Sequence, residues 1–388
     1  MVMIPELGVS TPDERRAQIV ETVRSFVETE IPRDVARGID REDVYPHELL
    51  RKFGNTGLLG INIPVEYGGL GGSAIDIMPV YEEISKRLPV LAWVIGNITL
   101  YGNDFISQSG SQEQKERFLP VLAQGRLKLS FALTEPNAGS DAASITTKAV
   151  LKDGDYWISG SKMFITGAGV SDIVVTMART APDKYQGITA FLVDTRTPGY
   201  SASPLKKLGY HGSNTCAVHY DNVRVRPSDI LGGEAGLNQG WYQMVQLLNS
   251  ERLALAACAL GIGQAALDDA VAYAKARFQS GRPRGRSQAI QHALVEMATE
   301  LEAARRLAHH AASMASQGLE CVKETSMAKY FATETARKIA LRGIDLLGRD
   351  GASLQFDMQR HLRDVLVLCI GGGTTQIQKN IIAKTMGL

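Results

Sequence analysis

The sequence predicts a mainly helical α+β protein with an N-terminal helical domain, a middle antiparallel β-barrel or sandwich domain, and a C-terminal antiparallel helix bundle. Apolar residues recur at helical spacing before residue 125 and after residue 233, whereas short runs rich in β-branched residues fill the segment between. A chain of 388 residues is also too long for one comfortable core. We therefore expect domains at residues 1–125, 126–232 and 233–388.

The N-terminal part carries clear helix-start signals. Thr11 can serve as an N-cap ahead of Pro12, which suits a first helical turn, and acidic residues follow. Ser73 can cap a later helix. An apolar helix is expected around residues 91–106, and another over residues 112–123, where Ser111 and Gln114 have capping-box spacing.

The middle part changes to a strand pattern. Residues 145–151 and 156–158 flank Asp153-Gly154, which predicts a β-hairpin. Short apolar runs at residues 173–177, 187–193 and 216–220 are each bounded by turn residues. Nothing in this part repeats as β-α-β, so an antiparallel barrel or sandwich is expected.

Beyond Gly232-Gly233 the helical period returns and holds to the end of the sequence, with breaks near residues 279–287, 317–318 and 348–353. Long amphipathic segments with short connections predict an antiparallel bundle. Residues 261–266 fit the dinucleotide pattern G-x-G-x-x-A, but that pattern needs a preceding strand and here it lies within a helix. Its small residues are therefore expected to allow close helix packing.

Composition argues against several classes of function. Hydrophobic residues make up 44% and charged residues 21%, as in a soluble globular protein, and the net charge of +1 gives no field that would attract nucleic acid or an anionic membrane. The four cysteines are widely scattered in the sequence. We expect them to be buried small hydrophobic residues of a protein in a reducing compartment. His309 and His310 have no partner at metal-ligand spacing, and no metal site is predicted. We see no signal peptide and no run long enough to span a bilayer, and expect a cytoplasmic protein.

The stretch from Phe131 to Asp141, FALTEPNAGSD, is the first candidate for a binding site. Its apolar run ends at Thr134, and Pro136 should stop a strand there. Gly139 would let a ligand approach the backbone, and free N–H groups in such a turn can bind an anion. An ordinary loop explains the same residues equally well, because Pro, Asn, Gly, Ser and Asp are the usual turn residues.

This stretch resembles the flavin site of the acyl-CoA dehydrogenase family, which carries a TEPxAGSD segment. The resemblance continues in order and spacing through FITG at 164–167, NSER at 249–252, RFQSG at 277–281 and GGGTTQIQ at 371–378. It covers nearly the whole chain. It implies a flavoprotein oxidoreductase that uses FAD to dehydrogenate an acyl thioester, of CoA or of a carrier protein, between its α and β carbons. The resemblance also implies a homotetramer that passes electrons to an electron-transfer flavoprotein or a similar acceptor.

The resemblance also assigns cofactor contacts. Phe164 stands where the family usually has a Trp packed on the flavin ring, although a core Phe and a surface Thr would be the ordinary reading of FITG by itself. Arg277 would reach the FAD pyrophosphate of a neighbouring subunit, for which its planar fork is suited. The full expected set is Phe131, Leu133, Thr134, Gly139, Ser140, Phe164, Ile165, Thr166, Arg277, Gln279, Ser287, Gln288, Asp345, Gly348, Arg349, Thr374 and Gln376.

The expected catalytic base is Glu251. Removing an α-proton from a thioester needs a carboxylate shielded from water, with a raised pKa. Most of the family carries this Glu in a Y-E-G-T segment, where this chain has Gly372, but the isovaleryl and long-chain types place it in the position of Glu251. The spacing agrees, because Glu251 falls in an apolar helical stripe with Met244, Leu248, Leu255 and Cys258. A Glu there could instead pair with a neighbouring helix or turn partly to solvent.

Gly372 is expected to keep a catalytic role through its backbone N–H, which in the family holds the thioester oxygen. By the same resemblance, Ser140, Asn249, Arg252 and Gly373 would contact the substrate, although a structural ion pair would explain Arg252 as well. The missing side chain at position 372 would leave room for a branched or bulky acyl group.

Two other functions stay open. Gly372 also suits an enzyme of this fold with elimination, desulfination or oxidase chemistry. Departures from the family pattern at Ser280, Asp345 and Arg349 suit a non-catalytic subunit of a heteromeric complex.

Overall fold

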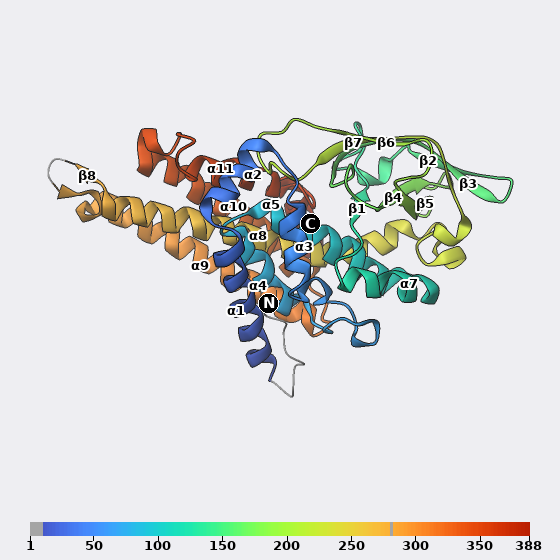
Figure 1. Cartoon of the computed structure of the whole chain (residues 1–388), viewed down its shortest axis with the longest axis horizontal. Helices are drawn as coiled ribbons and strands as arrows, with labels where there is room; N and C mark the ends of the chain where they lie inside the picture. Colours follow the sequence, from blue (N-terminus) through green and yellow to red (C-terminus); the bar gives the residue numbers. More distant parts are fainter. Residues whose placement is uncertain (1–10, 280–281) are drawn as a thin grey trace.

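The computed structural model describes residues 11–279 and 282–388, and it confirms the order of helices, β-sheet and helices (Figure 1). Ser280, one of the departures from the family pattern, lies outside the described residues. The sheet occupies one end of the molecule, and the long C-terminal helices extend to the opposite end, where the label β8 stands.

The N-terminal part consists of helices, as predicted. Capping boxes at Thr11 and Ser111 begin the first and last of them, each with its side chain bonded to the backbone three residues on. The helices are α1 (Pro12–Glu30), α2 (Arg33–Glu42), α3 (His47–Gly54), α4 (Ala74–Ser85), α5 (Pro89–Ile98), α6 (Phe105–Ser109) and α7 (Gln112–Ala123).

The single helix expected around residues 91–106 is divided by a wide π-helical turn, Thr99–Asp104, between α5 and α6. The Asn62 side chain donates to the Thr99 carbonyl at 2.7 Å and to the Asp104 carboxylate at 2.6 Å. A side chain that inserts into a helical ladder in this way is one of the known causes of local widening. The turn matters because it carries Tyr101, described below.

The middle part is one curled sheet of seven strands, ordered β1-β4-β2-β3-β7-β6 with β5 paired to β4. The strands are β1 (Leu129–Ala132), β2 (Lys148–Lys152), β3 (Asp155–Thr166), β4 (Ile173–Arg179), β5 (Ile188–Asp194), β6 (Tyr200–Pro204) and β7 (Thr215–Val225). The predicted hairpin is present as β2 and β3, whose turn residues Asp153 and Gly154 both have positive φ.

Two strand pairings differ from the antiparallel expectation. β1 pairs with β4 in parallel, and so does the end of β2, whereas the remaining pairs are antiparallel. A parallel pair needs a long connection, which residues 133–172 supply. Period-2 patterns show that strands exist but not which neighbour each one takes.

The C-terminal part is the predicted bundle, built from α8 (Gly240–Ala276), α9 (Gln288–Ser316), α10 (Val322–Leu347), α11 (Met358–Leu368) and α12 (Thr375–Thr385). The break between α8 and α9 holds a two-stranded ribbon, β8 (Phe278–Gln279) and β9 (Arg282–Pro283). α8 packs against α4, α9, α10 and α11, so one hydrophobic core joins the N-terminal helices to the bundle, and the sheet has a second core.

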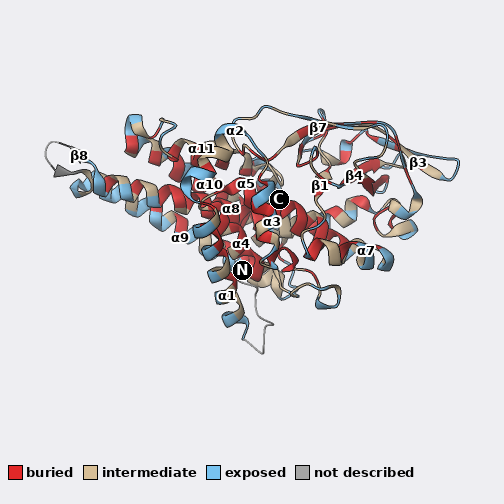
Figure 2. Ribbon diagram, viewed as in Figure 1, coloured by how far each residue is buried: buried red, intermediate tan, exposed pale blue. Residues whose placement is uncertain are grey.

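α8 is the central element of the fold, and Figure 2 shows buried residues concentrated along it and the helices that cross it. Among the described residues it is the one helix long and apolar enough to cross a membrane by length and composition, which the sequence-based expectation overlooked. However, 78% of its most apolar window is buried inside the protein. Its apolar character is that of a core helix.

The G-x-G-x-x-A pattern lies within α8, where it allows close packing, as expected. A Cβ at Gly261 would lie 2.2 Å from the Glu82 carbonyl oxygen of α4, and a Cβ at Gly263 would lie 3.0 Å from Leu301 Cδ1. Glycine at position 261 therefore sets how closely α4 and α8 approach.

We predict that Gly261→Ala lowers the free energy of unfolding by about 1–3 kcal/mol, because the new methyl group must push α4 backbone away. Gly38→Ala is the matched control, since Gly38 lies in α2 with open space around its Cβ position and should gain about 0.5–1 kcal/mol from better helix propensity. Denaturant unfolding measures both. A Gly261→Ala protein as stable as the parent would contradict this account of the α4–α8 contact.

Candidate active site

A mainly apolar cavity lies between α4, α5, the π-helical turn and α8. The space between its lining atoms is about 300 Å³, which includes the part that is open to solvent. Its wall is formed by Tyr81, Ala92, Trp93, Gly96, Asn97, Leu100, Tyr101, Glu251, Ala254, Leu255 and Cys258. Glu251 is the one acidic side chain in this wall, which places a carboxylate against a space suited to a short apolar group.

Glu251 projects from α8 and is half-buried where it meets the cavity. Its Oε1 atom accepts a hydrogen bond of 2.9 Å from the Tyr101 hydroxyl. Burial raises the pKa of the carboxyl above its usual 4.5, and the Tyr101 hydrogen bond and the charges of Arg252 and Lys329 oppose that rise only in part. A carboxylate with a raised pKa is a stronger base than an exposed one.

The loop Gly371–Gly373 between α11 and α12, called the glycine loop below, lies directly beside Glu251. A Cβ at Gly372 would lie 3.4 Å from Glu251 Oε1 and only 2.4 Å from Leu255 Cδ1, and Gly372 has a φ of 62°. Position 372 is thus next to the carboxylate of Glu251. The Leu255 methyl group lies against the Cβ position of residue 372, so this point of the wall suits glycine, and room for a bulky acyl group stays a prediction.

The backbone carbonyls of the glycine loop accept hydrogen bonds from side chains of α10 and α12. Lys329 Nζ donates to the Gly373 carbonyl at 2.7 Å, and Gln378 Nε2 donates to the Gly372 carbonyl at 2.9 Å. Within residues 11–279 and 282–388, the N–H groups of Gly372 and Gly373 donate to no protein acceptor. The loop therefore offers two backbone donors beside the Glu251 carboxylate.

Asn249 and Arg252 face into the protein. Asn249 Oδ1 accepts from Thr325 Oγ1 at 3.0 Å and from Arg252 Nη1 at 3.1 Å, which ties α8 to α10. Arg252 is only 5% exposed. Within the described residues Arg252 forms no ion pair, so the structural ion pair is not found, and its contact to the substrate stays a prediction.

The flavin-side residues gather at one corner of the sheet, where β1 and β3 meet. Met163 N–H donates to the Thr134 carbonyl at 2.8 Å, which brings the end of β1 beside Phe164. Thr166 follows at the end of β3, and its carbonyl accepts from Asn97 at 3.0 Å and from Ser130 at 2.8 Å. Since Asn97 also lines the cavity, this corner adjoins the cavity that holds Glu251.

Phe164 is the most unusual residue of this corner. Its side chain is 68% exposed and its φ is 62°, an uncommon conformation for a bulky residue. The ordinary reading as a core Phe is therefore wrong, whereas the neighbouring Ile165 is buried. An exposed aromatic face held in a strained backbone is typical of a site that stacks a flat ligand.

The FALTEPNAGSD turn is open on its outer side. Nothing lies within 4 Å of a Cβ built on Gly139, and Gly139 and Ser140 are exposed. The φ of Gly139 is not positive, so this glycine contributes open space and does not use its extra conformational freedom. Leu133 is half-buried just ahead of Thr134.

A buried ion pair anchors this turn. Lys162 Nζ lies 2.9 Å from Glu135 Oε1, and both side chains are almost fully buried. Burial alone would raise the pKa of Glu135, but the charge of Lys162 and the hydrogen bonds from Thr146 and Thr147 prevail and lower it from 4.5 to about 2. The pair joins the turn to β3, which carries Phe164.

The remaining expected cofactor residues lie elsewhere. Arg277 ends α8 at the far end of the bundle, where its guanidinium bonds Asp350 at 2.5 Å (Figure 1). Asp345, Gly348 and Arg349 are exposed in the same region, as are Ser287 and Gln288 at the start of α9, and the side chain of Gln279 lies outside the described residues. Thr374 caps α12 beside the glycine loop, and Gln376 is exposed there. One chain thus brings together the expected residues around Thr134, Phe164, Glu251 and Gly372, but not those around Arg277.

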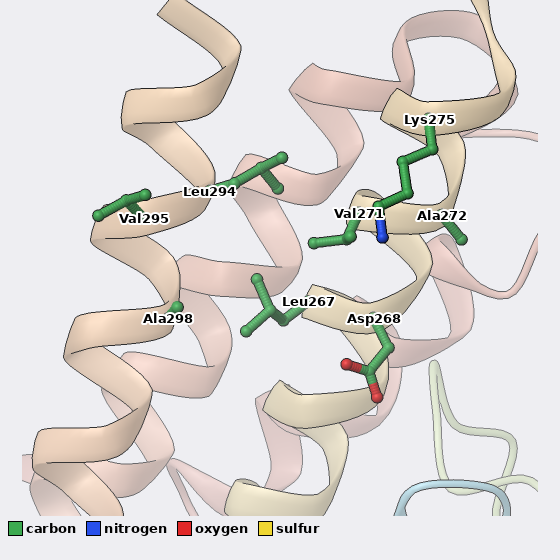
Figure 3. Close-up of a pocket in the computed structure, with 8 residues that line it drawn as sticks. All are labelled: Leu267, Asp268, Val271, Ala272, Lys275, Leu294, Val295 and Ala298. Atoms are coloured by element: carbon green, nitrogen blue, oxygen red, sulfur yellow. The ribbon is translucent and has the colours of Figure 1, made fainter. Parts of the chain in front are cut away.

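A larger hollow lies between α8 and α9, where Leu267 and Val271 face Leu294 (Figure 3). This groove has a volume of about 850 Å³, which includes space open to solvent. Its charged lining residues are Asp268 and Lys275. The groove lies toward the Arg277 end of α8 and contains none of the expected catalytic residues.

Sequence reasoning missed four residues that shape the site, namely Tyr101, Glu135, Lys162 and Lys329. Each acts through a partner distant in sequence, and Tyr101 lies 150 positions from Glu251. A signal was present for Tyr101, because it is one of several polar side chains in the otherwise apolar stretch from residue 91 to 106.

Comparison with known families is consistent along the chain. Models of the acyl-CoA dehydrogenase N-terminal domain, middle domain and C-terminal domain match residues 13–126, 130–223 and 238–387.

Proteins of similar sequence also cover nearly all of the chain. An acyl-CoA dehydrogenase of Bacillus subtilis is 41% identical over 96% of this chain and 97% of its own length. A 3-(aryl)acrylate reductase of Clostridium sporogenes is 40% identical over 96% and 98%, and the caffeyl-CoA reductase-Etf complex subunit CarC of Acetobacterium woodii is 34% identical over 95% and 97%. The structure of butyryl-CoA dehydrogenase from Megasphaera elsdenii matches with a TM-score of 0.93 at 30% identity, covering 98% of this chain and all of that one.

We predict that Lys162→Met lowers the free energy of unfolding by about 3–5 kcal/mol, because it leaves the Glu135 carboxylate buried without its cation. Lys184→Met is the matched control in the same domain, since Lys184 pairs with Asp141 on the surface at 3.1 Å and should contribute at most about 1 kcal/mol. Equal effects of the two substitutions in denaturant unfolding would contradict the anchoring role of Lys162.

The same pair predicts a pH dependence of stability. Because the pKa of Glu135 is depressed on folding, its contribution is complete above pH 4.5 and is lost as the pH falls toward about 2. Thermal unfolding should therefore show the Glu135→Gln variant losing less stability than the parent between pH 4.5 and about 2. Parallel curves for the two proteins in that range would argue against a depressed pKa.

Proposed function

The chain belongs to the acyl-CoA dehydrogenase family, and within that family we propose that Glu251 is the base that removes the α-proton of an acyl thioester. The protein is an FAD-dependent oxidoreductase that acts on CH–CH bonds, as the members of this family are. The observation that carries the proposal is the Glu251 carboxylate in the wall of an apolar cavity, held by Tyr101 and adjacent to Gly372.

In the proposed reaction the apolar cavity takes the acyl chain beside Glu251. Tyr101 occupies Glu251 Oε1, so Oε2 is the atom that would take the α-proton. The raised pKa of Glu251 suits a base that works near neutral pH. We further propose that the N–H of Gly372 donates to the thioester oxygen, which stabilises the negative charge that develops there as the proton leaves.

The residues present fit FAD. The exposed ring of Phe164 would stack on the flavin, the open backbone around Gly139 and Ser140 would admit the cofactor, and Thr134 and Thr166 lie at the same corner. When bound, FAD supplies the acceptor for the β-hydride. We propose that Phe131 and Thr374 complete the site on this chain.

We also propose a cytoplasmic homotetramer in which Arg277 serves the FAD of a neighbouring subunit. Arg277 stands between α8 and β8, and Figure 1 shows β8 at the end of the molecule opposite the sheet, which supports this arrangement. The apolar groove between α8 and α9, which a partner could cover, supports it as well. Electron-transfer flavoprotein is the proposed acceptor, since the relative from Acetobacterium woodii is named a subunit of a reductase-Etf complex.

The alternative chemistries now have less support, because Glu251 supplies a carboxylate next to the position where Gly372 lacks one. Reduced acceptor dye without peroxide would indicate a dehydrogenase, whereas peroxide in air would indicate an oxidase. Three relatives are named reductases, so the same assay run with an enoyl thioester and a reduced dye tests the reverse direction.

We predict that Glu251→Gln retains FAD and lowers the rate of flavin bleaching by a thioester substrate roughly 10²- to 10⁴-fold, because the amide cannot accept the α-proton. Butyryl-CoA and isovaleryl-CoA are suitable probes. Full-rate bleaching by the Glu251→Gln protein would rule Glu251 out as the base.

Asp104→Asn is the matched control for this substitution. Burial raises the pKa of Asp104 to about 6, so Asp104 could imitate a base in a pH profile, but its carboxylate bonds Asn62 and does not line the cavity. Flavin bleaching should survive in this variant.

A complementation experiment tests the role of Arg277. Arg277→Ala should weaken FAD retention, and Glu251→Gln should abolish turnover, when each is expressed alone. If Arg277 serves the neighbouring subunit, co-expression of the two variants creates some sites with both native residues, and activity should rise above that of either parent. Activity no higher than that of the parents would contradict the shared site.

A further inference from the structure

Tyr101 connects the proposed base to the strand that leads into the flavin corner. Its hydroxyl donates to Glu251 Oε1 at 2.9 Å. Its ring stacks on Phe131 with centroids 4.8 Å apart and planes 16° from parallel. Phe131 belongs to β1, which ends just before Thr134.

The position of Tyr101 is fixed from several sides. Phe131, on which the Tyr101 ring stacks, is itself packed edge-on by Phe105, with ring centroids 5.9 Å apart. The π-helical turn that carries Tyr101 is held by Asn62, which bonds both Thr99 and Asp104. A phenol on a rigid ring needs little further ordering to keep its hydroxyl on the carboxylate.

Other charged and titratable groups around Glu251 are few. Arg252 lies on the same helix and Lys329 comes from α10, and both contribute positive charge. Tyr81 and Cys258 line the same cavity, and the adjoining glycine loop has no side chains. Among the described residues, Tyr101 is the one group that donates a hydrogen bond to the carboxylate.

We propose that Tyr101 is a positioning residue for the base: its hydroxyl fixes Glu251 Oε1, leaves Oε2 free for the α-proton, and favours the charged carboxylate in an apolar wall. This inference rests on the proposed role of Glu251. Burial and the nearby charge of Glu251 hold the pKa of Tyr101 well above 10, so the phenol keeps its proton throughout the working range of pH.

The test is the pH profile of Tyr101→Phe. Without the donor the carboxylate binds its proton more readily, so the acidic limb of kcat/KM should move toward alkaline pH by about one unit. The KM at the alkaline plateau should change little, because the phenyl ring keeps the cavity wall. A purely structural role would instead lower activity by one factor at every pH.

Tyr81→Phe is the matched control. Tyr81 lines the same cavity, but its hydroxyl pairs with Thr99 Oγ1 at 2.6 Å and not with Glu251. Tyr81→Phe can alter KM, but the pH at which kcat/KM is half-maximal should equal that of the parent protein. An equal shift in both variants would overturn the assignment to Tyr101.

A second readout separates proton removal from redox turnover. The 3-thia analogue of butyryl-CoA has α-hydrogens but no β-carbon hydride to transfer, so exchange of its α-hydrogens in D₂O reports the base alone. Tyr101→Phe should slow this exchange about tenfold on the acidic limb and converge with the parent at alkaline pH.

The two ideas fail in different ways. If Glu251→Gln exchanges the α-hydrogens at the parental rate, the proposed base is wrong. If Glu251→Gln is inert but Tyr101→Phe follows the parental pH curve, only the role of Tyr101 is overturned.

Discussion

The site depends on one constraint: a carboxylate must stay ionisable inside an apolar wall. Burial disfavours the charged form of Glu251, and three groups restore part of the balance, namely the Tyr101 hydroxyl and the cations Arg252 and Lys329. The two cations have other partners, since Arg252 bonds Asn249 and Lys329 bonds the Gly373 carbonyl. They therefore act on Glu251 through charge at a distance, which leaves its pKa raised. Direct pairing would have depressed it and weakened the base.

The carboxylate and the glycine loop are two parts of one geometric solution. A Cβ at position 372 would touch the Glu251 carboxylate and collide with Leu255, and its φ of 62° disfavours any side chain. Two carboxylates in contact would also repel, and one would be forced to stay protonated. With Glu251 and Leu255 where they are, position 372 favours glycine. The same glycine leaves its N–H free beside the substrate cavity, so the loop can contribute a backbone donor in place of a side chain.

Local signals in the sequence were enough to predict most of the fold. The capping boxes at Thr11 and Ser111, the Asp153-Gly154 hairpin and the long C-terminal helices all follow from neighbouring residues. The parallel pairing of β1 with β4 and the π-helical turn did not follow, because each is set by a partner distant in sequence.

The site likewise divides into residues that local sequence predicts and residues that depend on distant partners. Glu251 could be selected from its apolar stripe and from the family resemblance, whereas Tyr101 and Lys329 act across 150 and 44 positions. Phe164 would ordinarily be predicted to lie in the core, because a large apolar residue is usually buried. Its exposed side chain could be found only from the structure.

The two halves of the reaction are linked through side chains that touch both. Tyr101 bonds Glu251, the proposed base, through its hydroxyl and packs its ring on Phe131, whose strand β1 ends at Ala132, two residues before Thr134. The Glu135–Lys162 pair then joins the turn after Thr134 to β3 and so to Phe164. The Glu135–Lys162 pair is buried and the contacts of Tyr101 are half-buried, so a shift on either side of the cavity would disturb the packing of the other. The position of Glu251 relative to Phe164 is therefore set by packing across the boundary between helices and sheet, which neither part could set alone.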